Sequence, residues 1–262
     1  MSDRVESQTV PEKAQIPQEE TLEDLGWRNL RIFQKKEGFR YGMDAVLLAD
    51  FARMGRRDRV ADLGTGTGIL PILLFGRDKG DSYDVFELQE TMADMARRSF
   101  EINGMEAFTS VHIMDVSDIP QKIPPCQWDH VICNPPYGTP GGGIKNPSET
   151  IALSRHQGEE GISPWLRSAA HLLRSRGRLS IIYPAQRMLE LMTKMQEMHL
   201  EPKRIRLIYP RVEKAANLVL IEAQKDARPL LHTEPPLIVY GMDGQMTEEL
   251  KKIYHLVSSE HL

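Results

Sequence analysis

The sequence predicts an α/β fold built on a mostly parallel β-sheet. Short apolar runs alternate with longer amphipathic stretches along most of the chain, which is the pattern of repeated β–α–β units. The chain has 262 residues, 40% of them hydrophobic, which is enough for one large domain with an aliphatic core or at most two small ones. Both observations favour a globular α/β protein.

The individual strands and helices follow from the apolar periods, in order along the chain. In the helix predicted over residues 89–103, Met92, Met95 and Phe100 recur at helical spacing, so the methionines are expected in the core. Past residue 226 we expect one short strand and one terminal helix. Strands are predicted at residues 59–63, 83–88, 110–114, 130–133, 178–183, 204–209 and 217–223. Helices are predicted at residues 44–54, 69–77, 89–103, 147–156, 163–174 and 185–199.

The amino-terminal segment differs in composition from the rest of the chain. Residues 1–24 carry seven acids and two bases and lack both aromatics and an apolar period, so we expect a disordered acidic extension. The formal charge of the whole chain is −4, so residues 25–262, predicted to be a single domain, are nearly neutral. Basic clusters within them indicate solvated surface unless they border a pocket with nucleic-acid chemistry. These clusters are Arg174, Arg176 and Arg178; Lys203, Arg204 and Arg206; and Arg211 and Lys214.

Several classes of protein are disfavoured by composition. No apolar run reaches the roughly 18 residues that a membrane span requires, and the start of the chain shows no basic-then-apolar signal peptide. Cys126 and Cys133 are too few and too poorly spaced for a disulfide framework or a zinc site. We therefore expect a cytoplasmic monomer that binds neither a membrane nor a metal.

A glycine-rich turn follows the first predicted strand of the parallel sheet. Gly64, Gly66 and Gly68 alternate with threonines between this strand and a helix, where the backbone must approach a ligand closely. The dinucleotide fingerprint would need its third glycine at Ile69, which disfavours NAD and FAD, and no Gly-Lys-Ser/Thr sequence completes a phosphate-binding loop. The turn therefore predicts a nucleoside ligand that lacks a pyrophosphate.

Three acids at successive strand ends strengthen that prediction. Asp62 lies two residues before the first glycine and can reach a cationic or amine-bearing ligand, while Glu87 closes the second strand and can accept both ribose hydroxyls. Asp115 closes the third strand and could accept from an adenine amino group. Each acid alone could instead cap a turn or a helix. Together they predict S-adenosylmethionine, whose sulfonium and amino groups favour carboxylates. The predicted cofactor-binding residues are Asp62, Gly64, Thr65, Gly66, Gly68, Glu87, Leu88, Asp115, Val116 and Asn134.

The fourth strand ends in the sequence Asn134-Pro135-Pro136-Tyr137. Two prolines cannot donate to a ladder, so the sheet must stop there. The Asn134 side-chain oxygen and the Pro135 carbonyl can accept both N–H bonds of a weakly nucleophilic amine, which directs its lone pair at the sulfonium methyl. Tyr137 offers a ring for stacking on a planar acceptor. We take these four residues as the catalytic set, although a lone sequence of this kind could be a plain turn.

The sequence resembles the class I methyltransferases whose (N/D)PP(Y/F) motif acts on amino groups of adenine, guanine or glutamine. The segments FRYGMDAVLLADF (39–51), NPPYGTPGGGIKNPSETIALSRH (134–156) and RVEKAANLVLIEAQK (211–225) are similar to the bacterial tRNA1(Val) N6-adenine methyltransferase family. That resemblance implies a Rossmann-like seven-stranded sheet with helices on both faces and an antiparallel hairpin at its C-terminal edge. It also implies methylation of the tRNA adenosine immediately 3′ of the anticodon.

The resemblance also suggests roles for further residues. Tyr41 and Asp44 would lie over the methionine end of the cofactor, with Asp44 either starting the next helix or simply capping it; the segment from Tyr41 to Asp44 departs slightly from the family pattern. A glycine-rich loop would close over the acceptor, or it could be an exposed loop without contact. The predicted tRNA-binding residues are Tyr137, Lys145, Asn146, Arg155, His156, Lys203 and Arg204.

Other functions stay open from the sequence. An N5-glutamine protein methyltransferase shares the motif, but such enzymes usually carry a helical N-terminal domain, and only about 40 residues precede the helix predicted at 44–54. Guanine-N2 methylation of ribosomal RNA would use the same two acceptors. A non-catalytic cofactor-binding RNA module is disfavoured by the presence of Asn134 and Asp62.

Overall fold

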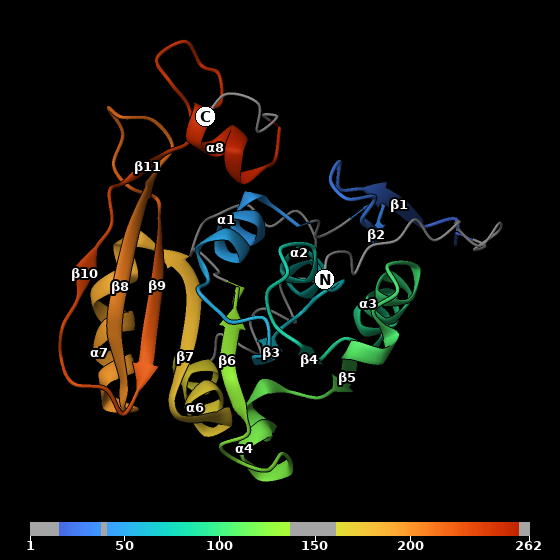
Figure 1. The fold of residues 1–262 in the computed structure, drawn as a ribbon, viewed down its shortest axis with the longest axis horizontal. Helices are drawn as coiled ribbons and strands as arrows, with labels where there is room; N and C mark the ends of the chain where they lie inside the picture. The colour runs from blue at the N-terminus through green and yellow to red at the C-terminus, as the bar shows by residue number, and fades with distance from the viewer. Residues whose placement is uncertain (1–15, 38–40, 137–160, 257–262) are drawn as a thin grey trace.

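The computed structural model describes residues 16–37, 41–136 and 161–256. Its main sheet has the strand order β10-β8-β9-β7-β6-β3-β4-β5, with β11 also paired to β8 (Figure 1). The strand order reverses between β3 and β6, and the predicted α/β class is confirmed. The seven long strands are β3 (Arg59–Leu63), β4 (Ser82–Glu87), β5 (Thr109–Ile113), β6 (Trp128–Cys133), β7 (Leu173–Pro184), β8 (Leu200–Tyr209) and β9 (Leu218–Lys225).

One long strand runs against the others. β9 is antiparallel to both β7 and β8, whereas β3, β4, β5, β6 and β7 pair in parallel. This is the reversed C-terminal edge that the sequence predicts. Beyond it, where one short strand was expected, the structure has two strands of two residues each, β10 (His232–Thr233) and β11 (Leu237–Ile238), both parallel to β8.

Helices cover both faces of the sheet. Neighbouring strand residues point to opposite faces, so Val60 packs in one apolar core and Ala61 in the other. The first core contains residues of α1 (Met43–Phe51), α2 (Ile69–Gly76), α3 (Glu90–Ile102) and α8 (Glu248–Ile253). The second contains residues of α4 (Ile119–Lys122), α6 (Ser163–Leu172) and α7 (Met188–Glu197). The helix predicted at 147–156 lies outside the described residues.

The segment predicted to be disordered contributes to the fold. β1 (Glu20–Asp24) and β2 (Arg31–Lys35) form an antiparallel hairpin, so the prediction of disorder over residues 1–24 is wrong for Glu20–Asp24. The hairpin packs on α3, where Phe33 joins a small apolar cluster and Glu20 accepts two hydrogen bonds from Arg98, at 2.8 and 2.9 Å. The acidic composition of this segment indicated disorder. Composition alone does not reveal that one of its acids, Glu20, is paired with Arg98 of α3.

None of the helices within the described residues is long and apolar enough to cross a membrane.

Candidate functional site

The carboxyl ends of β3, β4, β5 and β6 meet at one edge of the sheet. The order of strands reverses between β3 and β6, and open α/β sheets bind their ligands in the crevice at such a reversal. All of the strand-end residues predicted from the sequence, from Asp62 to Asn134, follow or close one of these four strands. The structure therefore brings the predicted cofactor residues together.

The glycine turn after β3 is packed from two sides. Gly64 and Gly68 have φ values of +69° and +89°, a region that side chains rarely adopt. A Cβ atom at Gly64 would lie 2.8 Å from the Trp165 ring of α6, and one at Gly68 would lie 2.7 Å from the Phe100 ring of α3. Only glycine fits at both positions. The sequence pattern identified the turn but not the two aromatic rings that hold it.

Glu87 joins the end of β4 to this turn. Its two carboxylate oxygens accept the backbone N–H groups of Gly66 and Gln89, each at 2.9 Å. Each carboxylate oxygen can accept a further hydrogen bond, so the predicted ribose contact remains available to it. Leu88 is 40% exposed beside Glu87 and offers an apolar surface to a flat ligand. The carboxylate and the turn form one preorganised unit.

Asp62 is buried without a partner. Neither carboxylate oxygen has a hydrogen-bonding partner among the described residues, and the same holds for the Thr65 hydroxyl in the turn. Burial raises the pKa of Asp62 from 3.8 to about 7; nearby Thr65 opposes the rise in pKa, and the charge of Glu87 adds to it. An unpaired buried carboxylate is costly, so this position favours a cationic or amine donor.

Asp115 and Val116 lie between β5 and α4. The Asp115 side chain accepts the Ser117 backbone N–H at 2.8 Å, which is the capping role that the sequence left open. Val116 is buried, and its carbonyl accepts the Ser168 hydroxyl at 2.6 Å. The segment is thus fixed to α6, next to the glycine turn.

The predicted catalytic sequence follows β6 directly. Asn134 is partly buried, Pro135 is buried and Pro136 is exposed. Burial raises the pKa of the neighbouring Cys133 thiol well above its ordinary value, and the charge of Asp62 raises it further, which places Asp62 and the start of this segment close together. Tyr137 and the predicted RNA contacts Lys145, Asn146, Arg155 and His156 lie outside the described residues.

The amino-terminal hairpin positions Tyr41. The Tyr41 backbone N–H donates to the Gln34 side-chain oxygen at 3.0 Å, and the Gln34 amide donates in turn to Glu23 at 2.9 Å. Gly42 is the N-cap of α1, so the alternative of Asp44 as a cap is wrong; Asp44 lies in the first turn. Sequence reasoning missed Gln34 and Glu23, since Glu23 falls in the segment interpreted as disordered.

Arg204 has a structural position, which corrects its prediction as an RNA contact. Its guanidinium lies 3.2 Å from Glu222 and 2.9 Å from Glu234, and it donates to the Phe51 carbonyl at 2.5 Å. The Arg204 side chain is 7% exposed, so it holds β8 and β9 to the end of α1 rather than meeting solvent. β8 lies four strands from β3, which is about 19 Å at the usual strand spacing. Lys203 is partly exposed and donates to the Arg228 carbonyl at 2.9 Å.

A mostly parallel sheet with one reversed strand, a glycine turn at the point where the strand order reverses and acids at successive strand ends define an α/β enzyme that binds a nucleoside-type cofactor. Sequence comparison identifies the family. The chain belongs to the methyltransferase small domain family, whose model matches residues 42–204.

Curated relatives agree with this family. The chain is 25% identical over 222 residues to the tRNA1(Val) (adenine(37)-N6)-methyltransferase of Shewanella sediminis, covering 82% of this chain and 90% of the relative. It is 28% identical over 224 residues to the protein of the same name from Shewanella sp. strain MR-4, covering 84% and 93%. A crystal structure of a predicted O-methyltransferase from Agrobacterium tumefaciens matches with a TM-score of 0.64 and 28% identity, covering 81% of this chain and 95% of that one.

Within the described residues, histidine, cysteine and acidic side chains do not gather in groups of three or more that could hold an ion.

Proposed function

We propose that this methyltransferase transfers a methyl group from S-adenosylmethionine to the exocyclic N6 amino group of an adenosine in tRNA, next to the anticodon. The names of the relatives support the tRNA substrate, since they match at 25–28% identity over most of both chains. The observation that carries the proposal is the position of Asn134 and Pro135, which directly follow β6, the strand that pairs with β3 and its buried Asp62. A tRNA substrate places the enzyme in the cytoplasm.

The described residues fit S-adenosylmethionine. Asp62 supplies a buried carboxylate for the cationic, amine-bearing end of the cofactor, and the unsatisfied hydrogen-bonding capacity of its oxygens suits such a donor. Glu87 can accept from the ribose hydroxyls while it keeps its bonds to the turn, and exposed Leu88 can pack on the adenine. Tyr41, held by the hairpin, closes the site at the start of α1. The cofactor supplies an activated methyl group.

The acceptor nitrogen is oriented rather than deprotonated before attack. The lone pair of an adenine amino group is delocalised into the ring, so the amine is a poor nucleophile. The Asn134 side-chain oxygen and the Pro135 carbonyl accept its two N–H bonds, which turns the lone pair toward the methyl carbon. Held in this way, the nitrogen would take the methyl group that the cofactor's sulfonium supplies, with the thioether as leaving group, and would then lose one proton to solvent. Tyr137 is proposed to stack on the purine.

A hydroxyl acceptor is the second candidate, favoured by the 28% identity to the predicted O-methyltransferase. A hydroxyl must lose its proton to become a good nucleophile, and the side-chain amide of Asn134 cannot act as a base. The amide therefore favours an amine acceptor.

The test is transfer of a tritiated methyl group from the cofactor into total small RNA, followed by mapping of the labelled nucleoside. N6-methyladenosine in tRNA is the expected product. Label at a ribose hydroxyl, with none on adenine, would refute the proposal. Asn134→Ala should lower turnover by about 100-fold while the cofactor affinity stays within a few fold. Gln121→Ala, which removes an exposed amide on α4, is the matched control.

A further inference from the structure

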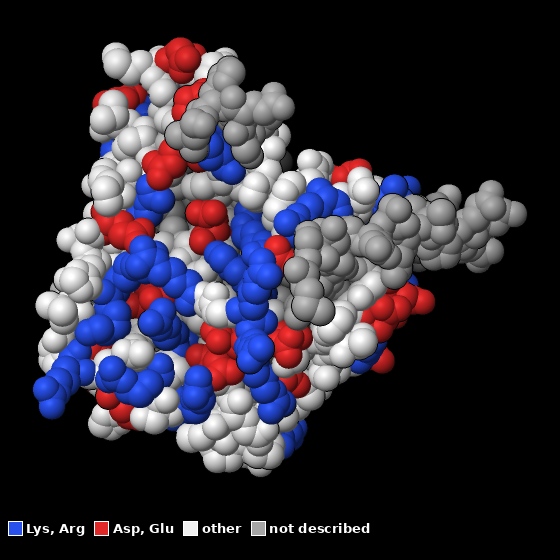
Figure 2. All heavy atoms as spheres, viewed as in Figure 1, with Lys and Arg blue, Asp and Glu red and all other residues white. Residues whose placement is uncertain are grey.

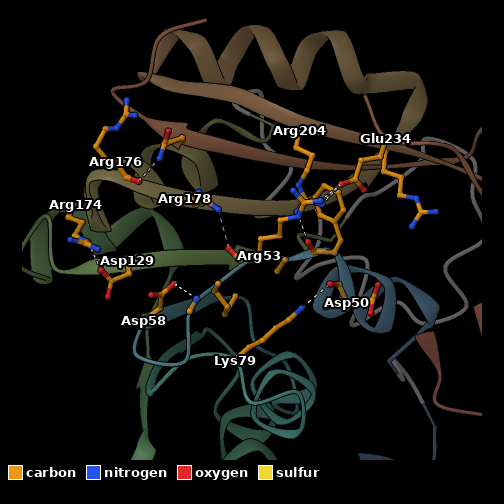
Figure 3. Close-up of a pocket in the computed structure, with 16 residues that line it drawn as sticks. Asp50, Arg53, Asp58, Lys79, Asp129, Arg174, Arg176, Arg178, Arg204 and Glu234 are labelled. Atoms are coloured by element: carbon orange, nitrogen blue, oxygen red, sulfur yellow. Dashed lines mark hydrogen bonds and ion pairs between the residues drawn. The ribbon is translucent and has the colours of Figure 1, made fainter. Parts of the chain in front are cut away.

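A cavity lies away from the methyl-transfer site, on the α1 face of the sheet over β7, β8 and β9. Its volume is about 780 Å³, and seven basic and four acidic side chains line it, an excess of three positive charges (Figure 3). Figure 2 shows lysine and arginine side chains gathered over the left and centre of this face, with acidic side chains among them. The charged lining residues are Lys79, Arg53, Arg174, Arg176, Arg178, Arg204, Arg206, Asp50, Asp58, Asp129 and Glu234.

The cavity exists because α1 covers only part of this face. Under α1, the strands present apolar residues such as Ile182 and Leu220. Nearer the start of β7, the same face carries polar residues. Ser180 lies opposite Glu222 of β9, and Arg178 lies opposite Gln224. Helix α1 ends at Phe51, so the polar part of the sheet stays open.

Buried Arg204 and partly buried Lys79 fix the floor and inner wall of the cavity. Lys79 donates to the Ala49 and Asp50 carbonyls at 2.9 and 2.8 Å, and Arg204 donates to the Phe51 carbonyl. These cations therefore neutralise the partly negative C-terminal end of α1. These contacts with carbonyls and acids hold both side chains in place, so they form the base of the cavity.

The most exposed cations lie on the rim, where β7 is irregular. The pairing of β6 with β7 shifts register between Trp128 and His130, and Arg176 has a left-handed φ of +66°. A Cβ atom at Gly177 would lie 2.9 Å from the Arg174 carbonyl. A bulge of this kind redirects side chains, and here it presents three arginines within five residues at the cavity mouth.

The arginines of the rim are ion-paired but keep part of each guanidinium group in solvent. Arg174 is 61% exposed and pairs with Asp129, Arg178 is 44% exposed and lies 3.6 Å from Glu222, and Arg53 is 65% exposed beside Glu234. A guanidinium group carries five N–H donors, so these side chains can contact a further anion while they hold their acids. Arg176 is exposed, and the described part of the chain pairs no acid with it.

We infer that this cavity, with its arginine rim, is a second contact site for the phosphate backbone of the RNA substrate. The inference rests on the proposed function. Arg178 pairs with His130, which is four residues before Asn134, so the rim lies about 13 Å from the acceptor site along the strand direction. A stem attached to the methylated loop presents phosphates over such a distance. Arginine suits them because its planar fork binds phosphate oxygens in pairs.

The test removes the charge of the rim and leaves the floor intact. The variant Arg174→Gln/Arg176→Gln/Arg178→Gln should bind whole tRNA roughly 10-fold more weakly at low salt. The slope of log affinity against log salt should fall by about 2, since each lost phosphate contact removes about 0.7. An isolated stem-loop too short to reach the rim should bind both proteins equally. The cofactor affinity should not change.

The matched control removes three exposed or helix-end charges elsewhere, by Arg97→Gln, Lys122→Gln and Lys252→Gln. It should keep the affinity and the salt slope of the unaltered protein. Arg176→Gln alone breaks no ion pair and should weaken binding about 3-fold, which keeps the test valid if the triple variant unfolds.

Equal tRNA affinity and salt slope in the rim variants and the control would overturn the inference. Competition by inorganic phosphate at the rim, with no change in tRNA binding, would overturn it in favour of a small-anion site. The proposed function is tested separately by methyl transfer from the unaltered protein to the stem-loop. Transfer without a rim effect refutes the second site alone, whereas absence of any RNA methylation refutes the proposed function.

Discussion

Asp62→Asn should stabilise the free protein at alkaline pH and weaken cofactor binding. Asparagine has nearly the same shape as aspartate and carries no charge, so the variant removes the cost of ionising a buried carboxyl group. The structure buries Asp62 fully, in the central strand of the sheet, with no hydrogen-bonding partner among the described residues. The free protein therefore bears a cost that the cofactor is proposed to relieve.

The size of the effect follows from the pKa of Asp62. Burial raises it from 3.8 to about 7, so between these pH values the folded protein holds a proton that the unfolded chain has lost. The contribution of Asp62 to the free energy of unfolding is therefore zero below pH 3.8 and becomes unfavourable as pH rises toward 7. About three pH units at roughly 1.4 kcal/mol each give about 4 kcal/mol above pH 7.

The titration of His130 changes the free energy of unfolding with pH in the opposite direction, so its contribution must be separated from that of Asp62. Burial, with Arg178, Lys79 and Arg204 nearby, lowers its pKa from 6.5 to about 3. The unfolded chain then binds the extra proton, so this contribution stabilises the fold above pH 6.5 and is lost as pH falls toward 3. The slopes of unfolding free energy against pH that Asp62 and His130 produce largely cancel between pH 4 and 6.5 in the unaltered protein.

The assay is urea unfolding of the unaltered protein and of Asp62→Asn, from pH 4 to 8, without cofactor. The difference in unfolding free energy between the two should grow from near zero at pH 4 to about 4 kcal/mol at pH 8. Asp118→Asn removes a 40% exposed acid and is the control, with a small and flat difference expected. Titration calorimetry in two buffers should also show proton release when the cofactor binds near pH 7.

A difference that stays flat across this pH range would refute the assignment of a raised pKa to Asp62. Full cofactor affinity in Asp62→Asn would separately exclude Asp62 as the partner of the cofactor's amine.

Three further predictions concern the rest of the fold and site. Gly68→Ala should destabilise the protein by about 1–3 kcal/mol in urea unfolding, because its Cβ would lie 2.7 Å from Phe100 at a φ of +89°; unchanged stability would contradict this packing. Arg204→Met should cost up to about 3–5 kcal/mol, because buried Glu222 keeps only the longer Arg178 contact and the Arg53 N–H; adding Glu222→Leu should restore much of it, whereas no recovery would contradict the pairing. Glu87→Gln should weaken cofactor binding in calorimetry by about 1–3 kcal/mol, and equal affinity would remove it from the ribose site.

The strand ends could be predicted from the sequence because local signals determine them. β3 runs from Arg59 to Leu63 as expected, since its apolar run stops at the glycine turn. β6 ends at Cys133 because the prolines that follow cannot continue a ladder. Parallel strands bring their carboxyl ends to one edge, so Asp62, Glu87 and Asn134 could be placed together without coordinates.

Arg204 could not be placed in this way, because its position depends on a register shift. The pairing of β8 with β9 is irregular between Pro202 and Arg204, which breaks the simple alternation of side chains and turns the arginine toward α1. Its partners Glu222 and Glu234 are distant in sequence. The arginine rim was visible as a cluster, but only the cavity beside it distinguishes it from a solvated surface.

The amino-terminal hairpin has a practical consequence for anyone who shortens this chain. Composition suggests residue 25 as a natural starting point, yet a chain that begins there loses β1 and leaves β2 as an unprotected edge strand, open to pairing with other molecules. It also removes Glu23, the acceptor for the amide of Gln34, a side chain only 1% exposed. A buried amide without its partner costs about 1–3 kcal/mol, and the same side chain accepts the backbone N–H of Tyr41, which we propose lies at the cofactor site. Such a truncated protein should aggregate more readily and bind its cofactor less well, although every motif of the family is retained.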